Sequence, residues 1–71
     1  MTLFERVLYY YESRKFEPVS RGWCKPPAGT RISSGVTQRM ADCGDYEFIR
    51  LYTGVSSGND FEYFLLQRKK V

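Results

Sequence analysis

The chain has 71 residues, of which 42% are hydrophobic and 17% aromatic, and its formal net charge is +3. This length predicts a single small domain, residues 1–71, and the high aromatic content excludes a disordered chain. The absence of histidine excludes the usual Ser-His and Cys-His forms of nucleophilic catalysis, and we predict that the protein is not an enzyme.

The first residues predict a helix. Thr2 and Glu5 have the spacing of a capping box, in which the threonine hydroxyl accepts a hydrogen bond from the glutamate N–H. The apolar residues that follow have the i, i+3, i+4, i+7 spacing of one helical face: Phe4, Val7, Leu8 and Tyr11. We expect Arg14 and Lys15 in the last turn, where positive charge complements the helix dipole.

The middle of the chain, residues 16–44, is interrupted by glycine and proline. We expect two short strands in it, Glu17 to Trp23 and Thr30 to Ser33. Residues Val36 to Ala41 are compatible with a helical turn or with another strand.

The last third predicts an antiparallel hairpin. Two runs rich in aromatic and branched residues, Tyr46 to Thr53 and Phe61 to Arg68, flank a turn loop from Gly54 to Asn59. Because a hairpin alone is not stable, we predict an α+β fold, in which the N-terminal helix packs on a small antiparallel sheet that ends in this C-terminal β-hairpin.

Alternation along the hairpin strands divides their side chains between two faces. The set expected to pack against the helix is Ile49, Leu51, Phe64 and Leu66. The other face is expected to carry rings and one arginine: Tyr46, Phe48, Arg50, Tyr52, Phe61, Tyr63 and Leu65. This second face is available to a ligand only if the middle segment does not fold over it through Val19, Trp23, Ile32, Val36 and Met40.

Charge is segregated along the chain. Residues 14–39 carry six basic side chains and one acid, residues 40–62 carry most of the acids, and Arg68, Lys69 and Lys70 are basic again. A basic patch of this kind attracts phosphate or an acidic protein surface, although scattered basic residues also serve solubility alone.

Metal, redox and membrane functions have little support in the sequence. Cys24 and Cys43 form no CxxC motif and have no histidine beside them, and the acids Asp42, Asp45 and Glu47 match no calcium-loop spacing. We therefore expect no metal and no cofactor. No stretch has the pattern of a signal peptide or a membrane span, so we expect a cytoplasmic protein with reduced thiols and no membrane partner.

The first third of the chain resembles the start of small phage proteins that sequester nucleotide signals of bacterial immunity. The residues that carry this resemblance are Phe4, Val7, Leu8, Tyr11, Lys15, Arg21, Gly22 and Trp23. The end of the chain departs from the pattern of that family, so none of its binding residues is carried over.

These features predict a small non-enzymatic binding module of phage or mobile-element type. The leading hypothesis is nucleic-acid binding through an aromatic and basic sheet face, on which rings stack on bases and cations contact phosphate. The candidate site residues are Tyr46, Phe48, Arg50, Tyr52, Tyr63, Arg68, Lys69 and Lys70. The alternative is a protein-binding inhibitor, anti-defence or regulatory, such as an anti-CRISPR-like protein. In it the same face occupies a surface of a host protein complex, or meets a second copy in a homodimer.

Overall fold

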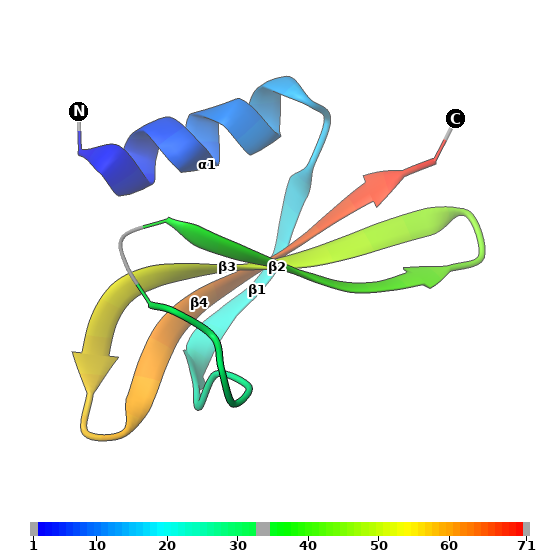
Figure 1. The fold of residues 1–71 in the computed structure, drawn as a ribbon. Helices are drawn as coiled ribbons and strands as arrows, with labels where there is room; N and C mark the ends of the chain where they lie inside the picture. The colour runs from blue at the N-terminus through cyan, green and yellow to red at the C-terminus, as the bar shows by residue number, and fades with distance from the viewer. Residues whose placement is uncertain (1, 33–34, 71) are drawn as a thin grey trace.

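One helix is followed by four strands. The computed structural model describes residues 2–32 and 35–70. Its elements are α1 Leu3–Ser13, β1 Glu17–Cys24, β2 Val36–Cys43, β3 Tyr46–Ser57 and β4 Asp60–Lys69. The strands form one antiparallel sheet in the order β1-β4-β3-β2, and α1 lies over one of its faces (Figure 1). The predicted α+β class and the C-terminal hairpin are confirmed.

Both ends of α1 are closed by local hydrogen bonds. At the start, the hydroxyl of Thr2 accepts a hydrogen bond of 3.1 Å from the N–H of Glu5, as the capping-box spacing predicts. At the end, the N–H of Phe16 donates to the carbonyl of Tyr11, and the N–H of Lys15 donates to the carbonyl of Glu12, both at 3.0 Å. This pair of bonds is the Schellman motif, which ends a helix in a left-handed residue.

The left-handed residue of this motif is Lys15, whose φ is 68°. Glycine is the usual residue at this position, because a Cβ makes the conformation unfavourable by about 1 kcal/mol. The expectation that Arg14 and Lys15 form the last helical turn is therefore wrong, since α1 ends at Ser13. The chain instead reverses here and delivers Phe16, whose ring packs edge-on against Tyr11 at 5.4 Å, to the core.

The core lies between α1 and the sheet. Its buried members are Phe16, Ile49, Leu51 and Leu66, and the half-buried residues packed against it are Phe4, Val7, Leu8, Tyr11 and Phe64. In the hairpin, Ile49 lies opposite Leu66 and Leu51 opposite Phe64, so the face predicted to meet the helix is the one that does.

The strand boundaries differ from the sequence prediction at two places. Residues Val36–Cys43 form the strand β2, whereas Thr30 to Ile32 belong to no strand and Ser33 lies outside the described residues. In the hairpin, β3 continues to Ser57 through the expected loop, because three residues of β3 stand opposite one of β4 between the pairs Tyr52–Tyr63 and Ser56–Phe61. Such a bulge lets a strand continue past turn-forming residues.

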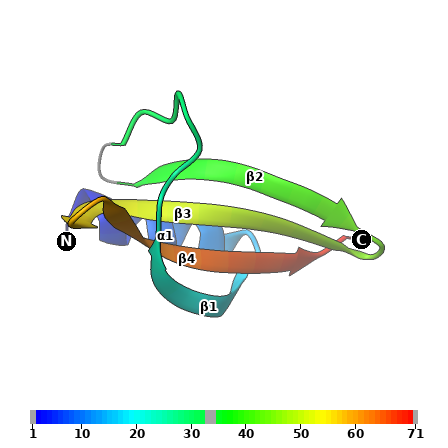
Figure 2. The same ribbon diagram turned by 90° about the horizontal axis from the view of Figure 1, so that it is seen from below.

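The connection between β1 and β2 has to cross the sheet, because these strands form its two edges. Figures 1 and 2 show that it crosses on the face opposite α1. Pro26, Thr30 and Ile32 in this connection are half-buried, whereas Val19, Trp23 and Met40 keep 42 to 48% of their surface exposed. The middle segment therefore covers part of the second face and leaves part of it accessible.

The end of this connection offers a test of the fold. Gly35 has a φ of +81°, and a Cβ there would lie 2.7 Å from Cγ2 of Val7 in α1. Gly29 has a φ of +84° but no atom within 4 Å of the same position. We expect Gly29→Ala to lower the free energy of unfolding by about 1 kcal/mol. Gly35→Ala is expected to lower it by a further 1 kcal/mol or more, about the amount by which overpacking destabilises a core, because the added Cβ would clash with Val7. Urea denaturation measures both, and equal losses would contradict the contact between Gly35 and α1.

Candidate functional site

Six of the predicted site residues share the face opposite α1: Tyr46, Phe48, Arg50, Tyr52, Tyr63 and Lys69. Their accessibility differs greatly. Tyr52 is fully buried, Phe48, Arg50 and Tyr63 are half-buried, and Tyr46 has 40% of its surface exposed. Of these rings, Tyr46 is the most exposed, and it lies at the end of the sheet, where a ligand can reach it.

Arg50 and Tyr52 form a polar network within this face. The Tyr52 hydroxyl donates to Oε1 of Gln38 at 3.2 Å and accepts a long hydrogen bond of 3.5 Å from Nη1 of Arg50. The Arg50 guanidinium lies 4.8 Å from the centre of the Tyr63 ring. The hydrogen bond with Tyr52 raises the pKa of Arg50 above its ordinary value. Both residues thus have structural partners in the described chain.

The three basic residues at the end of the chain lie on different sides. Arg68 lies on the helix face, where its guanidinium pairs with Glu47 at 2.5 Å and covers the ring of Phe16 at 4.7 Å. Lys69 is the register partner of Tyr46 on the opposite face. The N–H of Lys70 donates to the carbonyl of Asp45 at 2.6 Å, which ties the chain end to the turn between β2 and β3.

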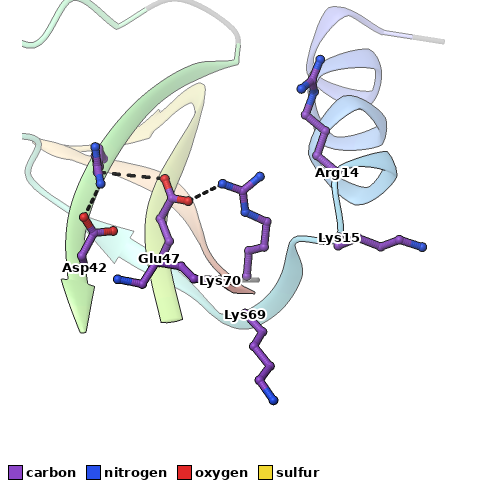
Figure 3. A pocket seen from close by; sticks show the side chains of 8 residues that line it. Arg14, Lys15, Asp42, Glu47, Lys69 and Lys70 are labelled. Atoms are coloured by element: carbon purple, nitrogen blue, oxygen red, sulfur yellow. Dashed lines mark hydrogen bonds and ion pairs between the residues drawn. The ribbon is translucent and has the colours of Figure 1, made fainter. Parts of the chain in front are cut away.

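A basic cavity of about 430 Å³ lies at this end of the sheet, beside the last turn of α1. Its lining comes from the helix end, from β2 and β3, and from the end of the chain (Figure 3). The six basic lining residues are Arg14, Lys15, Arg39, Arg68, Lys69 and Lys70, and the two acidic ones are Asp42 and Glu47. The fold therefore merges the basic middle and the basic end of the sequence into one positive site.

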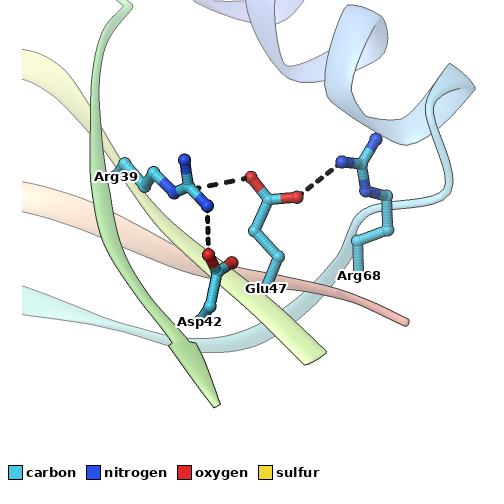
Figure 4. Close-up of polar contacts among 4 residues, drawn as sticks. All are labelled: Arg39, Asp42, Glu47 and Arg68. Carbon is cyan, nitrogen blue, oxygen red and sulfur yellow. Dashed lines mark hydrogen bonds and ion pairs between the residues drawn. The ribbon is translucent and has the colours of Figure 1, made fainter. Parts of the chain in front are cut away.

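Both carboxylates of this basic cavity are already paired. Glu47 in β3 lies between Arg68 of β4, at 2.5 Å, and Arg39 of β2, at 4.0 Å, while Arg39 also pairs with Asp42 (Figure 4). The other four basic residues, Arg14, Lys15, Lys69 and Lys70, form no ion pair with another described residue. A net positive charge is left for an anion to neutralise.

A second hollow, of about 380 Å³, adjoins the basic cavity. It is lined by Lys15, Glu17, Tyr46, Gln67 and Lys69, so Lys15 and Lys69 belong to both. We call this second space the tyrosine hollow. It joins the positive charge at the end of the sheet to the most exposed ring of the predicted aromatic face.

Sequence reasoning missed Arg14, Lys15 and Arg39 as site residues. The segregated charge pattern was the available signal, but it does not say which basic residues meet. Arg68 lies on the helix face, as alternation with Phe64 and Leu66 requires, so it joins these three residues and not the rings with which the candidate site combined it.

Metal clusters, disulfides and membrane-spanning helices are absent from the part of the chain that is described. Cys24 and Cys43 are free thiols, and residues 2–32 and 35–70 contain no group of three His, Cys, Asp or Glu side chains that could hold a metal. No helix among them has the length and apolarity needed to cross a membrane.

No protein-family model, curated protein or solved structure matches the chain.

The unequal burial of two tyrosines can be tested by stability. We expect Tyr52→Ala to lower the free energy of unfolding by about 3 kcal/mol or more, because it removes a fully buried ring. Tyr46→Ala removes a ring that is 40% exposed, and we expect a loss of about 1 kcal/mol or less. Thermal and urea unfolding measure both. Equal losses would contradict the difference in burial between Tyr52 and Tyr46.

Proposed function

We propose that this protein is a non-enzymatic module that binds nucleic acid at the basic end of its sheet. The observation that carries the proposal is the basic cavity, in which six cationic side chains surround two carboxylates that are already paired. Phosphate is the group that such a surface attracts most generally, because each contact releases condensed counterions from the nucleic acid. We place the protein in the cytoplasm, where its two free thiols stay reduced.

The chemistry of the cavity suits binding better than catalysis. Its basic residues are arginine and lysine, which donate hydrogen bonds and carry permanent charge at neutral pH. Histidine, the usual proton carrier near neutral pH, is absent from the chain. The protein is thus proposed to act by binding nucleic acid, without catalysing a reaction on it.

Salt dependence tests this proposal. Lys69→Gln combined with Lys70→Gln removes two exposed charges of the basic cavity. The logarithm of the affinity decreases linearly with the logarithm of the salt concentration. We expect this negative slope to become shallower by about 0.7 to 0.9 for each lysine removed. Fluorescence anisotropy with labelled oligonucleotides between 50 and 200 mM salt, about the range over which such contacts weaken most visibly, gives the slope.

Two matched variants sharpen this experiment. Lys25→Gln with Arg31→Gln removes the same charge from the connection between β1 and β2, which lies outside the basic cavity, and should change the affinity less. Glu47→Gln removes a negative charge from the cavity and should strengthen binding at low salt. If the two double variants changed the salt slope equally, binding would depend only on net charge. That result would contradict the proposed site.

A second candidate function is a protein-binding inhibitor, and a different surface favours it. A hollow of about 320 Å³ between the start of α1 and the sheet is lined by Leu3, Phe4, Val55 and Phe64 together with the paired Arg21 and Glu62. Leu3 and Val55 are 59% and 56% exposed. Exposed apolar side chains around a hollow are typical of protein contacts.

A pull-down from a nuclease-treated lysate tests the inhibitor surface separately from nucleic-acid binding. For an inhibitor, we expect one stoichiometric partner whose capture is lost on Leu3→Asp, because a charge would be placed in the apolar hollow. Capture should survive Lys69→Gln with Lys70→Gln, since those residues lie at the other site. Capture that survives Leu3→Asp would exclude this surface.

A further inference from the structure

The basic cavity and the tyrosine hollow lie on different sides of the sheet. Glu47 and Arg68, in the cavity, belong to the helix face, whereas Tyr46 and Gln67, in the hollow, belong to the opposite face. Lys15 and Lys69 line both spaces, and Figure 3 shows their side chains extending away from Glu47. A positively charged path therefore runs round the end of the sheet from one face to the other.

Tyr46 is the aromatic group on this path. Its ring is 40% exposed, and its register partner in β4 is Lys69. A ring and an ammonium group that line the same hollow match one nucleotide, whose base stacks on the ring while its phosphate meets the charge. The one acid of the tyrosine hollow, Glu17, is outnumbered there by Lys15 and Lys69.

The backbone at Lys15 gives independent support. Lys15 occupies the left-handed position of the Schellman motif, where glycine would be free of strain. Non-glycine residues held in such conformations cluster at functional sites, because the surrounding structure keeps them there in spite of the strain. Here the retained side chain reaches both the basic cavity and the tyrosine hollow, so its charge lies at the point where the path turns.

We infer that the nucleic acid bound by this protein is single-stranded and turns round the end of the sheet. Its phosphates follow the basic cavity and Lys15, and one unpaired base stacks on Tyr46. This inference rests on the proposed nucleic-acid binding and specifies its ligand. A base can stack on a side chain only when it is unpaired and turned out. A duplex, which is stiff over about 150 base pairs, cannot follow a path that passes from one face of a sheet to the other.

The experiment compares three DNA ligands of equal length by fluorescence anisotropy: a thymidine oligomer, a duplex, and an abasic oligomer that keeps the phosphates but has no bases. We expect the thymidine oligomer to bind more tightly than the duplex. Tyr46→Ala should weaken binding of the thymidine oligomer by roughly tenfold or more. The same variant should bind the abasic oligomer with unchanged affinity, because only a base contacts the ring. Tyr46→Phe keeps the ring and should retain most of the affinity.

Lys15→Gly separates a binding role from a structural one. This variant should melt several degrees higher, by about 4 °C or more, because glycine relieves the backbone strain. The same variant should bind the abasic oligomer more weakly, because one charge is removed from the path. A higher melting temperature with unchanged affinity would overturn the role of Lys15 and the turned path.

The outcomes also separate this inference from the proposed function. Equal binding of duplex and thymidine oligomer, with no effect of Tyr46→Ala, overturns the single-stranded ligand and leaves salt-dependent binding at the basic cavity intact. If none of the three ligands binds at 50 mM salt, about the condition that most favours phosphate contacts, the proposed function fails and this inference fails with it. Far-UV circular dichroism confirms that each variant is folded.

Discussion

The arrangement of the molecule depends on the turn that ends α1. Its two backbone hydrogen bonds, from Lys15 and Phe16, reverse the chain and place the Phe16 ring in the core beside Tyr11. This ring is 5% exposed and packs below the helix that the turn has just ended. The same turn places Arg14 and Lys15 at the end of the sheet, where β4 also ends. One local motif thus positions both the core and the basic cavity.

The basic cavity concentrates charge in a small protein, and Glu47 limits the repulsion. Its carboxylate lies between guanidinium groups from the two neighbouring strands, Arg39 and Arg68. Arg68 is also in contact with the face of the Phe16 ring, which is a favourable position for a cation. These contacts hold two positive groups in place at the end of the sheet, while the lysines around them remain available to a ligand.

The two faces of the sheet differ because of chain connectivity. The helix covers one face, and the connection between the edge strands β1 and β2 crosses the other. On the face opposite α1, Tyr52 is fully buried, whereas Tyr46, at the end of the sheet, remains 40% exposed. Arg50 contacts Tyr52 and Tyr63 and acts as a structural member of the face. Among the rings predicted for this face, the one that stays exposed therefore lies at the end of the sheet.

The sequence by itself determined the helix start at Thr2, the hairpin and the division of its residues between two faces, because capping and alternation are local properties. It also revealed separate basic segments. Only the tertiary structure decided that Arg14, Arg39 and Lys69 line one cavity and that Tyr52 is buried. Those facts depend on the strand order and on the path of the connection between β1 and β2. Both are set by contacts between residues far apart in the chain, which no local pattern specifies.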